Sequence, residues 1–236
     1  MIESEASSMY TNVNLAAPIG VVLLLGAGLV MLLLSVVFLY LVVTRKFSQS
    51  RLVVGALLVI VGGYLAAMLI FSFASRDEVL ARGQEKHFCE LDCHLAYSVA
   101  NVVQTKTLGS AADAISAKGT FYLITVKTRF DENTISARRG SGLLSPNPRA
   151  IKVMDATGVC YSPSVADQDL LTRVGITGTP ITTPLRPAET YTTTFVFDLP
   201  SNINHPTLVI NESDWITHLI IGHENSLAHK KTTFQI

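Results

Sequence analysis

The sequence predicts a two-helix transmembrane hairpin followed by an all-β, antiparallel sandwich on the extracytoplasmic side of a membrane. Two observations carry this prediction. The first third of the 236-residue chain holds two long apolar runs without a charged residue. The remainder alternates short β-prone runs with turn residues, which is typical of a sandwich. Only 15% of all residues are charged, against about 25% in soluble proteins.

The two apolar runs cover residues 17–43 and 52–74. Each exceeds the roughly 20 residues that a helix needs to cross the hydrocarbon of a bilayer. A cleaved signal peptide fits the first run poorly, because Glu3 and Glu5 stand where a positive n-region would be expected. We therefore expect two membrane-spanning helices, at residues 17–43 and 52–74.

The flanking charges predict the orientation of these spans. The link at residues 44–51 carries Arg45, Lys46 and Arg51, whereas the N-terminal arm at residues 1–16 carries no Lys or Arg. Because cytoplasmic loops are enriched in basic residues, the link is predicted to be cytoplasmic. The arm and everything after residue 74 then lie on the periplasmic side of a bacterial inner (plasma) membrane.

Small residues in the spans indicate close helix packing. Gly62 and Ala66, and likewise Gly63 and Ala67, are four positions apart on one helix face. They pack either within the hairpin or against a helix of a larger complex. The expected partners are thus the lipid bilayer and other membrane-protein subunits. Nucleic acid is not expected, because the formal net charge is zero.

The outer part divides into a juxtamembrane connector at residues 75–94 and a periplasmic β-sandwich at residues 95–236. Short apolar runs bounded by Gly, Pro, Asn and Asp predict its strands. They lie at residues 97–105, 121–130, 150–155, 159–161, 191–199, 207–211, 215–221 and 231–236. Trp215 is expected in the core, and one helical turn is expected at residues 166–174.

Three blocks of this domain resemble a known family. They read Lys-Gly-Thr-Phe-Tyr-Leu-Ile-Thr-Val at residues 118–126, Met-Asp-Ala-Thr-Gly-Val-Cys-Tyr at residues 154–161, and Leu-Arg-Pro-Ala-Glu-Thr-Tyr at residues 185–191. Similar blocks occur in bacterial membrane-anchored, telokin-like immunoglobulin-fold domains of unknown function. The resemblance covers residues 95–221 and implies an immunoglobulin-like sandwich with a membrane anchor, but no activity.

The overall topology is similar to that of cytochrome c oxidase subunit II, which implies a cupredoxin-like alternative for the sandwich. That family binds two copper ions with a Cys-x3-Cys loop that has a Glu between the thiolates. Cys89 and Cys93 have this spacing, with Glu90 between them. Here, however, the loop precedes the first predicted strand of the sandwich, His94 follows it directly, and no Met lies nearby. The resemblance therefore concerns topology.

The cluster from His87 to His94 leaves several interpretations open. Thiolate and imidazole ligands suit copper or zinc, so Cys89, Cys93 and His94 are candidate metal ligands. His87, or His223 or His229 near the C-terminus, would complete the set. A haem attached through a stretched Cys-x2-Cys-His motif is a less favoured cofactor than copper.

The same cysteines are also candidates for a disulfide, since a periplasmic location favours oxidation. The pairing would join Cys89 to Cys93, or one of them to Cys160. Unpaired thiols are the remaining interpretation. The sequence alone does not choose between these states.

These observations together favour a non-catalytic accessory subunit of a larger membrane complex, of a kind found in electron transport. No arrangement typical of an enzyme is readable in the sequence. Two alternatives stay open: a redox or metal-carrying protein that uses Cys89, Cys93 and His94, and a periplasmic module that binds or senses a ligand through its long loops.

Overall fold

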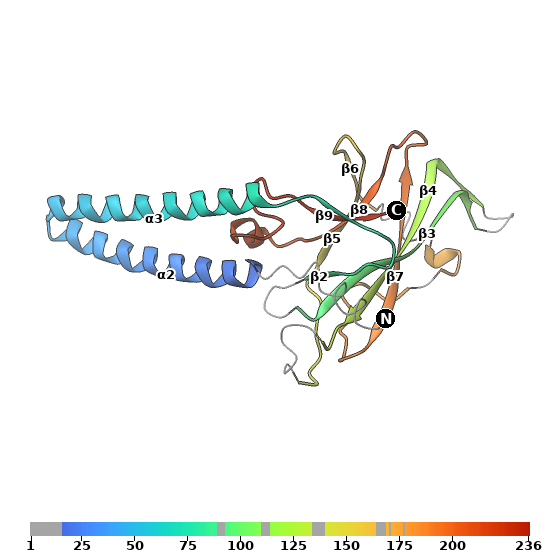
Figure 1. Ribbon diagram of the computed structural model, residues 1–236, viewed down its shortest axis with the longest axis horizontal. Coiled ribbons are helices and arrows are strands. Elements are labelled where there is room, and N and C mark those ends of the chain that lie inside the picture. The colour runs from blue at the N-terminus through green and yellow to red at the C-terminus, as the bar shows by residue number, and fades with distance from the viewer. Residues whose placement is uncertain are drawn as a thin grey trace, which may run out of the picture. The chain divides into compact units, whose positions relative to one another are not determined.

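The computed structural model describes residues 16–88, 93–109, 114–133, 140–163, 169, 171–176 and 178–236. The chain forms two compact units. The helix unit contains the two long helices and the segment Trp215–Lys230. The β unit contains Asp77–Asp214 and Lys231–Ile236. Figure 1 shows the helices and the strands of these units.

The helix unit is built on an antiparallel hairpin of α2 (Ala16–Val43) and α3 (Phe47–Ala74). The Lys46 N–H donates to the Leu41 carbonyl over 2.8 Å, while Arg45 adopts a left-handed backbone with φ of 57°. This is the pattern of a Schellman motif, which ends a helix by satisfying its last carbonyls. The turn is shorter than the predicted link at residues 44–51. α3 begins at Phe47, so residues 47–51 of that link are helical.

Both helices direct apolar side chains outward. The most apolar stretch of α2 has no buried residue, and only 6% of the corresponding stretch of α3 is buried. Both helices are long and apolar enough to cross a membrane. The prediction of two long apolar helices is therefore confirmed. Within the part of the chain that the structure describes, neither helix is enclosed by other elements as the core helix of a globular domain would be.

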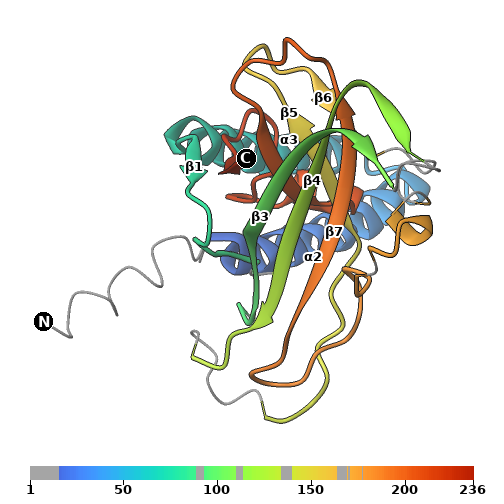
Figure 2. The ribbon, with the colours of Figure 1, turned by 90° about the vertical axis from the view of Figure 1, so that its right-hand side faces the viewer.

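The described residues of the β unit form two sheets, with strand orders β1-β9-β8-β5-β6 and β2-β3-β4-β7. Figure 2 shows β3, β4 and β7 side by side, with β5 and β6 behind them. The strands are β1 Glu78–Leu80, β2 Lys86–Phe88, β3 Leu95–Leu108, β4 Ile115–Phe130, β5 Arg149–Met154, β6 Cys160–Tyr161, β7 Thr190–Leu199, β8 Thr207–Glu212 and β9 Thr232–Gln235.

The core lies between the two sheets. Alternate residues of β4, such as Ile124 and Val126, are fully buried and pack with Val153 of β5 and Ile210 of β8 in one cluster. This is the two-residue period of a strand with one face in the core. A second cluster joins residues with the opposite parity in β4, Phe121 and Leu123, to Val196 and Leu171. Residues 169 and 171–173 are helical, within the predicted helical turn.

Seven of the eight predicted strands are confirmed, with boundaries shifted by up to six residues. The prediction of a wholly antiparallel sandwich is wrong in one pair, since β1 runs parallel to β9, with Glu78 opposite Thr232. Both strands begin within two residues of the point where the chain leaves the helix unit, so they run in the same direction. β1 and β2 lie in the predicted connector, where their three-residue length hid them.

The predicted strand at residues 215–221 is wrong. Trp215–Leu219 form a 3-10 helix, η1, in the helix unit. Trp215 is 69% exposed and is not a core residue. The run resembled a strand because it is short, apolar and rich in isoleucine, but its backbone makes local hydrogen bonds, such as Ile220 N–H to the Thr217 carbonyl over 3.3 Å.

Candidate functional site

A network of charged side chains lies where the connector joins the four-stranded sheet. Asp131, directly after β4, is its centre. One Asp131 oxygen, Oδ2, lies 3.0 Å from His87 Nε2 of β2, and both side chains are fully buried. The same oxygen accepts a hydrogen bond from Arg129 over 2.9 Å. Arg129 also donates two hydrogen bonds to Glu85, over 2.7 and 2.6 Å, in a bidentate ion pair.

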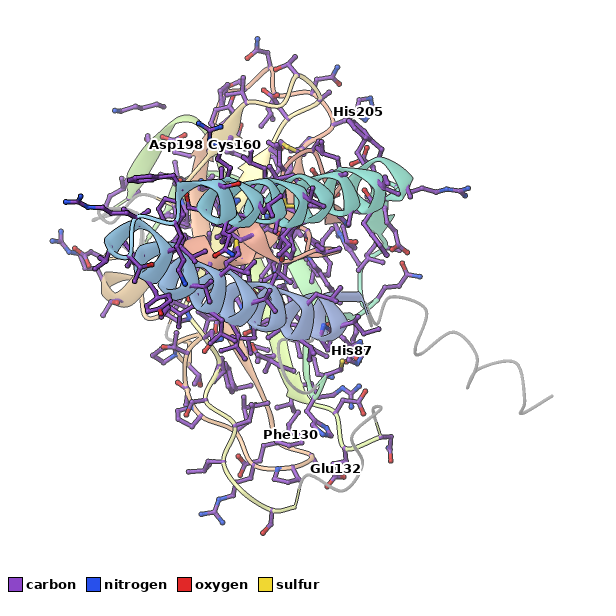
Figure 3. All side chains as sticks on the ribbon, turned by 90° about the vertical axis from the view of Figure 1, so that its left-hand side faces the viewer. His87, Phe130, Glu132, Cys160, Asp198 and His205 are labelled. Atoms are coloured by element: carbon purple, nitrogen blue, oxygen red, sulfur yellow. The ribbon has the colours of Figure 1, made fainter. Side chains whose placement is uncertain are left out.

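Strand pairing positions these groups. β2 pairs with β3 so that His87 lies opposite Ala96, which fixes the imidazole beside the end of β4. The Asp131 N–H donates to the His94 carbonyl over 2.7 Å, and His94 Nδ1 lies 2.6 Å from the Asp131 carbonyl. The His94 ring also contacts the ring of Phe130. Figure 3 shows His87, Phe130 and Glu132 gathered at one end of the β unit.

The network keeps Asp131 ionised. Burial raises the pKa of this carboxyl, but hydrogen bonds from His87, the Asn133 N–H and Arg129 outweigh burial, so the pKa is lowered from its usual 3.8. The pKa of Arg129 is raised further above its already high range, chiefly by the hydrogen bond to Glu85. Asp131 and Arg129 therefore stay charged across the physiological pH range.

The ligand atoms of Glu85, His87 and Asp131 lie within 4.8 Å of one another, the one group among the described residues that has metal-ligand geometry. The Arg129 guanidinium already contacts both carboxylates and supplies the positive charge that a metal would bring. A cation at this position would have to displace it. The arrangement is thus best described as a buried ion-pair network that fixes β2 and the preceding turn to β4.

The three cysteines differ in location and in bonding state. Cys89 lies outside the described residues. Cys93 is completely buried, and its sulfur is not a free, titratable thiol. Cys160 is an exposed, free thiol, so the predicted alternative that pairs it with another cysteine is wrong. Figure 3 places Cys160 at the end of the β unit opposite to His87.

The predicted histidine ligands belong to different units. His94 is a buried residue of the β unit and uses Nδ1 toward the Asp131 carbonyl. His223 and His229 belong to the helix unit. The His223 Nδ1 accepts a hydrogen bond from the Asn225 N–H over 3.0 Å, and His229 Nδ1 lies 2.6 Å from the Lys230 carbonyl. The structure assigns each ring a hydrogen-bonding role within its own unit.

A second polar cluster links the two sheets through the core. Lys86 projects from β2 on the face opposite to His87, and its ammonium donates to the carbonyls of Ile210 and Thr232 over 2.9 and 3.0 Å. Arg149 of β5 pairs with Glu212 over 3.2 Å, with both side chains at least 95% buried. The Arg149 guanidinium also lies over the ring of Phe88, at 4.2 Å.

The sequence did not reveal either cluster. His87 belonged to the recognised motif, but its partner Asp131 is 44 positions away. Sheet pairing alone brings the two together. One available signal was the sequence Arg-Phe-Asp at residues 129–131, where charged residues flank the last apolar residue of a predicted buried strand.

An open hollow of about 870 Å³ lies where the β3–β4 connection meets residues 173–176, which belong to one of the two long loops predicted to contact a partner or ligand, at residues 132–149 and 162–187. Its walls combine strand ends with the short helix region. They are formed by Thr107, Leu108, Gly109, Ala114, Ile115, Arg173, Val174 and Ile176. Arg173 is the one charged residue among the described residues of this lining.

No protein-family model matches the chain, and no curated protein matches it either. Several solved structures match part of it. A conserved hypothetical protein from Bacillus anthracis is 13% identical, with 56% of this chain and 89% of that chain covered and a TM-score of 0.42.

Two further structures are similar. The secreted protein MPT63 from Mycobacterium tuberculosis is 12% identical over 68% of this chain and 98% of its own, with a TM-score of 0.41. An uncharacterized β-sandwich protein from Clostridium difficile 630 is 11% identical over 69% and 95%, with a TM-score of 0.38. The described strands of this chain form two packed sheets by their own pairing, in a chain that also contains two apolar helices.

Proposed function

We propose that this protein is a membrane-anchored, non-catalytic accessory subunit. In this proposal α2 and α3 cross a bacterial inner membrane and hold the β-sandwich, of an immunoglobulin-like or cupredoxin-like type, on its periplasmic side. The observation that carries the proposal is the outward apolar surface of both helices, with large side chains such as Leu25, Leu32, Leu58 and Phe73 more than half exposed.

Energetics favour a bilayer around this surface. Each square ångström of apolar surface left in water costs about 25 cal/mol, and monomeric soluble proteins rarely expose an apolar patch of more than a few hundred square ångströms. The exposed apolar side chains run along two 28-residue helices. Lipid removes this cost without any rearrangement, and the helices satisfy their own backbone hydrogen bonds there.

The glycines of the spans support a partner helix. At Gly26, Gly28, Gly62 and Gly63 an added Cβ would meet no atom within 4 Å. The hairpin therefore does not use these four glycines for its own packing, and a helix of another subunit can approach the backbone there. Participation in electron transport rests only on the topological similarity to cytochrome c oxidase subunit II.

Labelling of native Cys160 tests the topology. This thiol is exposed and free, so a membrane-impermeant maleimide added to intact spheroplasts should label it. Cys160→Ser should remove that label. In the Cys160→Ser background, Thr44→Cys in the predicted cytoplasmic turn should react only after the membrane is opened. Labelling of Thr44→Cys in sealed cells, together with no labelling of Cys160 in sealed wild-type cells, would reverse the orientation.

Substitution of the open glycines tests membership of an assembly. Gly62→Leu and Gly63→Leu should shift the protein from a high-mass species to a free one in native gels after mild detergent extraction. Val54→Phe adds bulk at an exposed position nine residues from Gly63, on the opposite side of α3 from that glycine, and should leave the high-mass species intact. A free, monodisperse wild-type protein would exclude the accessory role.

The proposal includes a disulfide between Cys89 and Cys93. It is supported by the burial of Cys93, whose sulfur is not a free thiol, and by the free state of Cys160. Denatured protein should then expose one reactive thiol before reduction and three after it.

Two alternatives remain to be measured. Copper or haem at Cys89, Cys93 and His94 is tested by metal analysis and an absorption spectrum, and ligand binding at the hollow by thermal shift.

A further inference from the structure

The segment Trp215–Lys230 connects β8 to β9, yet it lies in the helix unit, beside helices far away in the sequence. Tyr64 of α3 donates a hydrogen bond from its hydroxyl to the Leu219 carbonyl over 2.6 Å. The Ile221 carbonyl lies so close to α2 that a Cβ on Gly20 would overlap it. In Figure 1 the red turn of η1 lies between the start of α2 and the end of α3.

The segment runs along the helices and returns to their end. Lys230 donates its backbone N–H to Oγ of Ser75, directly after α3, over 2.9 Å. Tyr64 precedes Ala74, the last residue of α3, by ten positions, which corresponds to about 15 Å of helix. The segment therefore covers roughly the last three turns of α3 before it comes back.

This position falls within the apolar part of the hairpin. About 20 residues cross the hydrocarbon of a bilayer, so a span that begins at Leu52 ends near Phe71. Tyr64 lies seven positions before Phe71, about 10 Å further into the apolar region. If the hairpin is inserted as proposed above, the Leu219 carbonyl is at the depth of the outer acyl chains.

The interior of the segment is polar. Thr217, His223, Asn225 and Ser226 are all at least 91% buried. Asn225 donates from its side-chain amide to the Thr217 hydroxyl over 2.9 Å, and the Ser226 hydroxyl donates to the Ile220 carbonyl. His218 Nδ1 also contacts the Asn225 carbonyl at 2.6 Å. Non-helical backbone is tolerated within the hydrocarbon region where its polar groups form hydrogen bonds inside the protein, as they do here.

The exterior of the segment is mainly apolar, and the ring of the exposed His218 uses Nδ1 toward the Asn225 carbonyl. Trp215 and Leu227 are 69% and 65% exposed, and Ile216 and Leu219 are also exposed. A loop in water would show the opposite distribution, with its polar groups hydrated and its apolar groups inside. This exterior continues the apolar surface of α2 and α3, and tryptophan is enriched where a bilayer meets water.

We propose that Trp215–His229 is a membrane-embedded re-entrant element, whose outer face is covered by lipid acyl chains of the periplasmic leaflet. This inference rests on the proposed membrane anchoring. Asp214 and Lys230 place charges at its two ends. Glu224, the one acidic residue inside it, is half-buried and engaged with neighbouring groups. The protein thus meets the bilayer through a third element that belongs to the β8–β9 connection.

Trp215 reports on this directly, because it is the only tryptophan in the chain. The full-length protein is reconstituted into phosphatidylcholine vesicles with bromine near the top or near the end of the acyl chains. The expected result is blue-shifted emission, stronger quenching by the shallow bromines than by the deep ones, and little quenching by aqueous acrylamide. Trp215→Phe should abolish the signal.

Two matched variants locate the lipid contact. Leu227→Asp places a charge on the exposed face of the segment and should remove most of the quenching by shallow bromines. Val159→Asp makes the same kind of change at an exposed apolar residue of the β unit and should leave the quenching unchanged. An equal loss in both variants would contradict the proposal.

Each remaining outcome has a single meaning. Full access of Trp215 to acrylamide, in protein that stays in carbonate-washed membranes, would overturn the re-entrant element while leaving the anchor intact. Protection from both bromine and acrylamide would assign the face to a protein partner and overturn the lipid contact. Loss of the protein from carbonate-washed membranes would overturn the anchor itself, which is a failure of the proposed function.

Discussion

The two units of this protein distribute polarity in opposite ways. The helix unit leaves apolar side chains on its surface, from Leu25 in α2 to Leu227 in the segment after η1. The β unit buries charged side chains, including those of Lys86, Arg149 and Asp131, between or beside its sheets. The comparison teaches that buried side chains need not be apolar and exposed ones need not be polar. The helix unit is expected to face lipid and the β unit water, and each exposes the side chains that suit its expected surroundings.

Substitution of an apolar side chain and substitution of a buried charged one also differ in the interaction that is lost. Apolar contacts are lost in proportion to the area involved, whereas a buried charge that loses its partner is left without compensation. The substitutions below separate these cases, from the largest expected effect to the smallest. All of them use the full chain in detergent micelles or membranes.

Glu212→Gln should have the largest effect. It leaves the Arg149 guanidinium, which is 2% exposed, without its carboxylate. Breaking a buried ion pair in this way costs about 3–5 kcal/mol. Urea unfolding followed by the β signal in circular dichroism should therefore shift strongly. Glu78→Gln, at an exposed position of β1, should change the free energy of unfolding by no more than about 0.5 kcal/mol. A small shift for Glu212→Gln would mean that Arg149 is compensated by other groups.

Leu29→Lys tests the other unit. Leu29 lies at the middle of α2 and is 58% exposed, so a lysine there meets no protein atoms that it must displace. In lipid the charge costs about 2.5–3.5 kcal/mol, whereas in water an exposed substitution changes stability by about 0.5 kcal/mol or less. The fraction of protein that resists carbonate extraction should fall. Val159→Lys in the β unit is the control, and equal extraction of both variants would argue against a span.

Asp131→Asn removes the charge at the centre of the network around His87. Hydrogen bonds to charged groups contribute about 1.5–3 kcal/mol, so a loss of this size is expected at neutral pH. The folded-state pKa of Asp131 lies below 3.8, so its contribution is complete above that pH. The contribution is lost as the pH falls through the lower folded-state pKa. The difference in urea midpoint between the wild type and Asp131→Asn should therefore shrink in acid, and a constant difference would contradict the assignment.

Gly119→Ala should have the smallest of these effects. Its new Cβ would overlap the Leu199 carbonyl of β7, and the backbone must shift to admit it. Overpacking of this kind costs about 1–3 kcal/mol. The shift would also disturb the hydrogen bond from the Gly119 N–H to Asp198, which measures 2.9 Å. Gly142→Ala, where an added Cβ meets nothing, is the matched control in the same unfolding measurement.

The sequence predicted what depends on local pattern. Runs of apolar residues defined both helices, and alternation defined strands such as β4 and β7. It failed where tertiary context decides. The run from Trp215 resembles a strand by composition, yet the helix unit takes it as a 3-10 helix. β1 is three residues long, so its identity as a strand comes from its partner and not from its own pattern.

The site shows the same limit. A compact motif drew attention to the cysteines and to His94, because ligand types that are close in sequence are easy to recognise. The groups that the fold brings around Asp131 precede and follow β3 in the sequence, and no local spacing of residues predicts that they meet. Arg129 is the decisive residue, since its guanidinium takes the position that a metal would need.

The parallel pairing of β1 with β9 has a consequence for biosynthesis. β1 stands at the edge of its sheet, and β9 is its one neighbour there among the described strands. β9 follows the other four described strands of this sheet in the sequence, so it is translated after all of them. During translation, β1 emerges directly after the second helix, and its described strand partner is not available until β9 has been made. The five-stranded sheet can thus be completed only after β9 has been translated, which makes the addition of β1 the step that waits longest for its partner.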